Sequence, residues 1–148
     1  MMRLLNTSLV YLLLGLLAGV FYREYTKAIG APGGGQLSTL HTHLLVLGMI
    51  MFLLVLVLDA VFGLTGRRFF GVFYWTYNIG LAITIVMMVV RGMLTANGVS
   101  PADTSAAIPG IAGLGHIVLS VGLVFLFVTL REAVAEKIAA RGEVAAAE

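Results

Sequence analysis

The chain lacks cysteine altogether, and charged side chains make up only 11% of its 148 residues. Without a thiol the protein has no disulfide, thiolate metal site, iron–sulfur cluster or covalently attached c-type haem. Soluble domains carry about 25% charged residues, so this chain has too few charges to cover a globule in water. The small net charge of +2 reflects few charges rather than a basic patch, and it gives no basis for binding nucleic acid.

Long apolar runs occupy most of the chain, because 60% of the residues are hydrophobic. A membrane-spanning helix needs about 20 mostly apolar residues. Four stretches meet that length, at residues 4–22, 37–62, 69–90 and 109–130. Each must be a helix, since lipid cannot satisfy backbone N–H and C=O groups. The sequence therefore predicts an all-α, four-helix transmembrane bundle forming one domain over residues 1–148, whose polar tail at 131–148 extends the last helix into water.

Lysine and arginine are divided unevenly between the two sides of the membrane that four spans create. One side holds both termini and the second connection, with six basic residues: Arg3, Arg67, Arg68, Arg131, Lys137 and Arg141. The other side holds three: Arg23, Lys27 and Arg91. Because excess Lys and Arg marks the cytoplasmic side, we expect both termini to be cytoplasmic. The layout is that of a multi-pass protein of the bacterial cytoplasmic (inner) membrane, surrounded by lipid.

All three histidines of the chain, His41, His43 and His116, fall within predicted spans. An ionisable side chain inside a membrane is costly and by default marks a functional site. His43 lies about 9 Å below Leu37, and His116 about 10 Å below Pro109, where their helices enter from the outer side. Histidines on two helices therefore meet at one depth in the outer leaflet. Four-helix bundles build cofactor sites from facing helices in this way.

The two neighbouring histidines point in different directions, because two residues correspond to about 200° around a helix. His41 shares its face with Gly48 and Phe52, whereas His43 shares its face with Leu54. In a monomeric bundle one of the two imidazoles would face hydrocarbon. We therefore expect a homo-oligomer, dimeric or trimeric, with the second helix at the interface.

Haem b suits these histidines best. Bis-histidine ligation needs two neutral imidazoles from separate segments, an apolar slot and no sulfur. Arg91 and Arg23 lie on the same outer side and are candidates to pair with the haem propionates. We therefore predict a membrane b-type haem protein with His41, His43 and His116 as candidate axial ligands.

Glycines near the histidines have two explanations. Residues 110, 113 and 115 are all glycine, and they directly precede His116. They either leave room for a flat macrocycle or allow close helix packing, which small residues favour in membranes. In the first span, Gly15 and Gly19 form a G-x-x-x-G step, which predicts helix packing.

Two other classes of protein stay open. Imidazole and thioether ligands suit copper, and Met49 and Met51 follow the histidine pair, one to two turns deeper than His43. Methionines in apolar helices more often fill the core. The other class is a cofactor-free structural subunit whose histidines only hydrogen-bond between helices. An acid–base enzyme is disfavoured, because Asp59 is the only carboxylate that borders an apolar run, and it falls at the opposite interface.

The segment Leu40–Gly48, of sequence LHTHLLVLG, resembles a His-x-His segment of small four-helix bacterial membrane proteins related to subunit I of haem–copper oxidases and nitric oxide reductases. The spacing to His116 is similar to that of an uncharacterised group of this kind. In the large oxidases, a His-x-His on the second helix of a four-helix unit ligates two haems from opposite faces. The resemblance therefore implies haem ligation by His41 and His43, and an oligomer that completes the core.

The chain departs from the oxidase pattern in two respects. It has no further histidines for a copper site of three imidazoles, and no tyrosine follows a histidine at the spacing of the cross-linked pair. Oxygen reduction of the oxidase type is therefore not expected within one chain. Electron transfer and gas binding stay open, and the sequence identifies neither a redox partner nor a quinone.

Reporter fusions test the predicted orientation. Because the Lys/Arg bias places the C-terminal end in the cytoplasm, we expect green fluorescent protein fused after Glu148 to fluoresce and alkaline phosphatase fused there to be inactive. The same reporters inserted in the 91–108 connection serve as controls and should give the reverse pattern. Active phosphatase at the C-terminal end would invert the layout and place the histidines in the inner leaflet.

Overall fold

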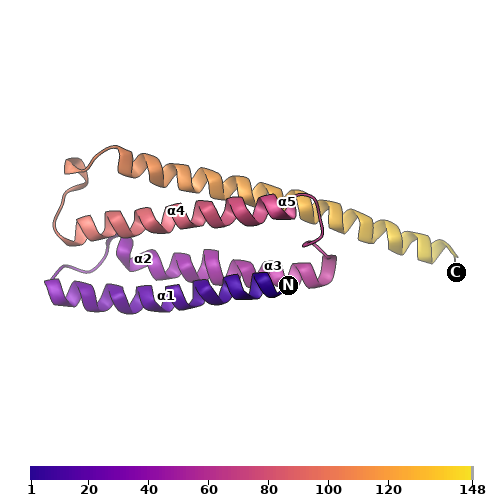
Figure 1. Ribbon diagram of the computed structural model, residues 1–148, viewed down its shortest axis with the longest axis horizontal. Helices are drawn as coiled ribbons and strands as arrows, with labels where there is room; N and C mark the ends of the chain where they lie inside the picture. The colour runs from indigo at the N-terminus through magenta and orange to yellow at the C-terminus, as the bar shows by residue number, and fades with distance from the viewer. Residues whose placement is uncertain (148) are drawn as a thin grey trace.

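A computed structural model of the protein describes residues 1–147, so that Glu148 of the polar tail lies outside the described residues. The described chain is helical throughout, apart from its connections (Figure 1). The elements in order are α1 (Met2–Ile29), α2 (Gly35–His43), the π-helical segment η1 (Leu44–Ile50), α3 (Met51–Phe62), α4 (Phe70–Ala96), the short 3-10 helix η2 (Pro101–Asp103) and α5 (Ala107–Ala147). The elements α2, η1 and α3 follow one another without a break and form one helix.

Four helices are long and apolar enough to cross a membrane: Met2–Ile29, Gly35–Phe62, Phe70–Ala96 and Ala107–Ala145. This confirms the predicted all-α architecture of four spans. The helices are longer than the apolar runs that predicted them, because a helix continues through the polar residues at its ends. Arg91 therefore lies within α4 rather than at its end, which corrects the predicted boundary at residue 90.

The helices form two antiparallel hairpins. The first pairs α1 with the continuous α2–α3 helix, and the second pairs α4 with α5, while α4 also packs against α2 (Figure 1). At one end, the Met1 amine lies 3.7 Å from the Asp59 carboxylate, and Arg67 lies 2.8 Å from Glu136. The start of α1 and the α5 segment at Glu136 therefore lie at the same end of the bundle as the 63–69 connection, and α5 continues beyond this end (Figure 1). Which side of the membrane this end faces stays a prediction from the basic residues.

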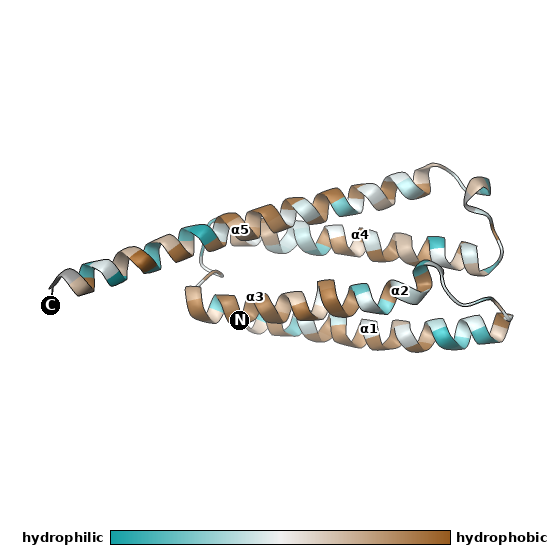
Figure 2. Cartoon of the chain, turned by 180° about the vertical axis from the view of Figure 1, so that it is seen from behind, coloured by the Kyte–Doolittle hydropathy of each residue, from teal (hydrophilic) through white to brown (hydrophobic). Residues whose placement is uncertain are grey.

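The surface of the bundle is apolar along most of its length. Leu17 on α1, Val57 on α3 and Phe127 on α5 are each 59% to 68% exposed. Exposed apolar surface of this extent indicates a lipid environment. Beyond the bundle, hydrophilic and hydrophobic residues alternate along the C-terminal part of α5 (Figure 2).

Glycines allow α4 and α5 to approach closely. A Cβ atom on Gly122 would lie 2.8 Å from the backbone nitrogen of Tyr77, and one on Gly115 would lie 2.8 Å from the hydroxyl of Thr84. A Cβ atom on Gly113 would meet nothing within 4 Å. Gly115 is thus explained by helix packing, whereas Gly113 leaves an open surface next to His116.

Substituting Gly122 tests the close approach of α4 and α5. Because an added methyl group would meet backbone atoms of Tyr77, we expect Gly122→Ala to lower the free energy of unfolding by about 1–3 kcal/mol. Gly113→Ala is the matched control, and it should be neutral or stabilising by up to about 1 kcal/mol, because alanine favours the helix. Denaturant titration in detergent followed by circular dichroism measures both. Equal effects of the two substitutions would contradict the packing.

Candidate functional site

His41 lies at the interface between α1 and α2. A Cβ atom on Gly15 would lie 2.7 Å from the Leu45 side chain, and one on Gly19 would lie 3.7 Å from the Cβ atom of His41. This confirms that the G-x-x-x-G step serves helix packing. The Nδ1 atom of His41 is buried without a hydrogen-bond partner among residues 1–147, and its Nε2 atom lies 3.4 Å from the Thr42 hydroxyl.

His43 and His116 share one hydrogen-bond arrangement. The Nδ1 atom of His43 lies 3.0 Å from the carbonyl oxygen of Thr39, and that of His116 lies 2.8 Å from the carbonyl oxygen of Ala112. A carbonyl oxygen only accepts, so Nδ1 carries the proton in each ring. In a neutral imidazole this leaves the lone pair on Nε2. A backbone carbonyl on the other ring nitrogen is also what orients histidines that bind metals.

Contacts along α4 give the depth of His43. Near one end of α4, a Cβ atom on Gly92 would lie 2.8 Å from the backbone nitrogen of Leu37. Nearer the other end, the Tyr77 hydroxyl donates to the Leu47 carbonyl at 2.9 Å. His43 lies between Leu37 and Leu47 in the sequence, so it lies level with the middle of α4.

His116 lies at the same depth as His43. A Cβ atom on its neighbour Gly115 would lie 3.0 Å from Ile83, which is at the middle of α4. The two histidines are therefore level on two helices that both pack against α4. His116 is exposed, whereas His43 is half-buried, and His43 lies about 200° around its helix from His41, away from α1.

The three histidines do not form a three-ligand centre inside one chain. Within residues 1–147, no group of three or more His, Asp or Glu side chains is placed to hold a metal ion. His41 packs on α1, His43 lies on the other side of the same helix, and His116 lies on α5. The arrangement can supply single imidazole ligands to a group that lies outside the core of the bundle.

The helix changes to π geometry directly after the histidine pair. Short π-helical segments are rare and often occur at functional sites. Two carbonyls of η1 accept hydroxyl groups from neighbouring helices: Ser8 donates to Met49 at 3.0 Å, and Tyr77 donates to Leu47 at 2.9 Å. These bonds fasten η1 to α1 and α4. The spacing along this span predicts a regular α-helix and gives no sign of the π-helical segment; in the sequence, Ser8 and Tyr77 show only as hydroxyl groups within apolar runs.

The two candidate arginines, at the end of the bundle opposite the N-terminus, differ in their surroundings. Arg23 is exposed and forms an ion pair with the Glu24 carboxylate, at a distance of 3.4 Å. Arg91 is half-buried, and the described chain gives it neither a hydrogen bond nor an ion pair. Arg91 follows Ile83 by eight residues, so it lies about 12 Å farther than the histidines toward the end of the bundle opposite the N-terminus.

The fold and these positions define the class: a multi-pass helical membrane protein with histidines inside its spans. The chain belongs to the DUF2871 family, described as proteins of unknown function, whose model matches residues 1–133. The match covers α1 to α4 completely and α5 from its start to residue 133. No curated protein and no solved structure matches the chain. The relation to the haem–copper oxidase unit therefore stays a prediction from the resemblance.

Proposed function

We propose that this protein is a b-type haem protein of the bacterial cytoplasmic membrane, with His43 and His116 as axial ligands. One observation supports this proposal. In both rings Nδ1 is hydrogen-bonded to a backbone carbonyl oxygen, which leaves Nε2 free to act as a ligand. When bound, haem b supplies one-electron redox chemistry or a site for a small gas molecule. The residues of the chain orient the imidazoles and provide the apolar surroundings.

In this proposal the haem lies between chains of a homo-oligomer, a dimer or a trimer. His116 is exposed, and Cβ atoms on Gly110 and Gly113 would meet nothing within 4 Å. A flat macrocycle can therefore approach the surface of α5 next to His116. Gly113 precedes His116 by three residues and lies on the same face of α5. Because α4 packs between α2 and α5, the second imidazole, His43, comes from a neighbouring chain.

The remaining candidates take secondary roles. His41 faces α1, so it takes part only in a second haem site on the opposite face of its helix, as the oxidase resemblance implies. Arg91 is the better propionate partner, because it has no carboxylate of its own in the described chain. Arg23 already forms an ion pair with Glu24, so it is the weaker candidate for pairing with a propionate.

Absorption spectra of the membrane-extracted protein test the haem proposal. We expect a Soret band and, after reduction, an α-band that His43→Ala and His116→Ala each abolish or sharply alter, because each removes one axial ligand. His41→Ala is the matched control and should keep the band of the His43–His116 haem. Unchanged spectra in all three variants would contradict the ligand assignment. Without a Soret band, metal analysis decides between a copper protein and a cofactor-free subunit.

Cysteine cross-linking tests the proposed oligomer. The described chain contains no native cysteine, and Leu54 exposes 52% of its side chain on the helix that carries His43. We expect Leu54→Cys to form a disulfide-linked dimer on mild oxidation, since this helix lies at the proposed interface. Leu17→Cys, on the lipid face of α1, is the control and should stay monomeric on denaturing gels. Native mass spectrometry that shows only a monomer with full haem occupancy would contradict the proposal.

A further inference from the structure

A groove of about 750 Å³ opens between α1 and α4, in the half of the molecule that holds both termini. Its lining is polar near the start of the two helices, where Arg3 and Asn6 lie. Deeper in the membrane the lining is apolar, with Leu14 on α1 and Ile85 on α4. This groove is separate from the histidines of the proposed haem site, none of which lines it.

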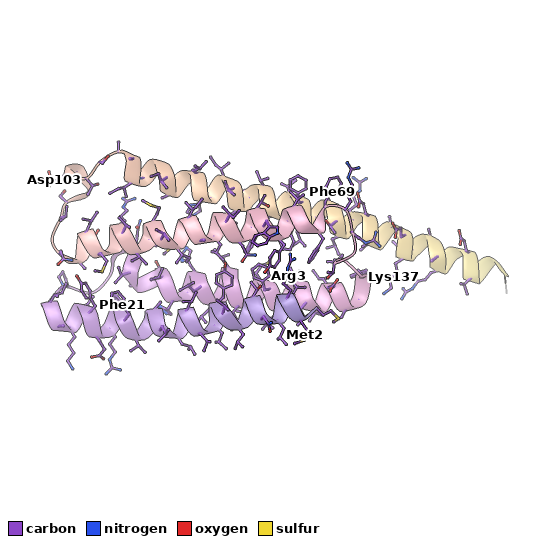
Figure 3. All side chains as sticks on the ribbon, in the orientation of Figure 1. Met2, Arg3, Phe21, Phe69, Asp103 and Lys137 are labelled. Atoms are coloured by element: carbon purple, nitrogen blue, oxygen red, sulfur yellow. The ribbon has the colours of Figure 1, made fainter. Side chains whose placement is uncertain are left out.

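The side chain of Arg3 is held at the polar end of the groove. Its guanidinium carbon lies 3.6 Å from the centre of the Tyr74 ring and 5.9 Å from that of Trp75. The Tyr74 hydroxyl lies 2.7 Å from that of Thr7, which in turn donates to the Arg3 carbonyl at 2.9 Å. Figure 3 shows Arg3 near the start of α1, on the side of α4. Among residues 1–147 no carboxylate lies within 4 Å of the Arg3 guanidinium group, so its charge is not neutralised by an acidic side chain.

The groove has the depth of one lipid leaflet. The next charged residue after Arg3 in α1 is Arg23, about 30 Å along the helix, which equals the thickness of the hydrocarbon core. Arg3 therefore lies at a membrane boundary. From Arg3 to Leu14 the groove extends about 16 Å, or half of that core.

We propose that the α1–α4 groove binds one anionic phospholipid from the leaflet next to both termini. The lipid phosphate pairs with the guanidinium group of Arg3, a geometry in which arginine offers two parallel N–H donors. One acyl chain lies along Val10, Leu14 and Ile85. An anionic headgroup is specified because the cation at the polar end has no carboxylate partner. An acyl chain is specified because the lining beyond Tyr11 and Asn78 is apolar.

Quenching of the single tryptophan tests this inference, because Trp75 lines the groove and exposes 60% of its side chain. The full chain is reconstituted into phosphatidylcholine vesicles that contain brominated phosphatidylglycerol or brominated phosphatidylcholine. We expect phosphatidylglycerol to associate about fivefold more tightly than phosphatidylcholine, equivalent to about 1 kcal/mol for one basic residue at the surface. Arg3→Gln should remove this preference. Arg68→Gln, an exposed arginine at the same end that does not line the groove, should keep it.

A second variant keeps the test decisive if Arg3→Gln does not fold. Ala82 lines the groove and is exposed, so Ala82→Phe should fill the groove and reduce quenching by both brominated lipids. Soluble glycerol phosphate should not displace the lipid, because it has no acyl chain; displacement would show a phosphate site instead. Equal quenching by the two lipids, or equal loss of preference in Arg3→Gln and Arg68→Gln, would overturn the inference.

Discussion

Lipid offers no hydrogen bonds, so a polar side chain within a span must find its partner in the protein itself. Thr84, Ser120 and Thr129 each donate to the backbone carbonyl four residues earlier, and this one bond satisfies their single proton. His43 and His116 make the same kind of bond through Nδ1. An imidazole has a second nitrogen, however, and the described chain gives their Nε2 atoms no partner. The proposed haem ligation starts from that unmet requirement.

Close packing on α4 brings these two histidines to one level. Glycines of α5 lie against the backbone and side chains of α4, and Gly92 of α4 lies against Leu37 of α2. Contacts this close leave little freedom for a helix to slide along its neighbour, because protein interiors are densely packed. Between α1 and α4 the contacts instead run through longer side chains, such as Tyr11, which donates to Asn78 at 2.9 Å. The wider spacing there leaves the groove that Arg3 borders.

Much of the architecture could be predicted from apolar runs, because a span needs a minimum length and lipid permits only helices there. The G-x-x-x-G step at Gly15 and Gly19 was also informative, since small residues mark close helix contacts. The start of α4 was predicted to within one residue, but its C-terminal end was predicted less well, because the helix continues past the last apolar residue to Ala96. The π-helical segment could not be predicted, since its shift in hydrogen bonding requires no particular residue type.

The sequence by itself determined the number of spans and the common depth of His43 and His116, because the rise per residue of a helix converts position into depth. Only the tertiary structure decided direction: that His41 packs on α1, that His43 lies away from it, and that Arg3 rests on the Tyr74 ring. The neighbour that a side chain meets depends on where the other helices lie around its own helix. The ring nitrogen that stays free depends on which one is hydrogen-bonded to a backbone carbonyl oxygen. Neither can be read from spacing along the chain.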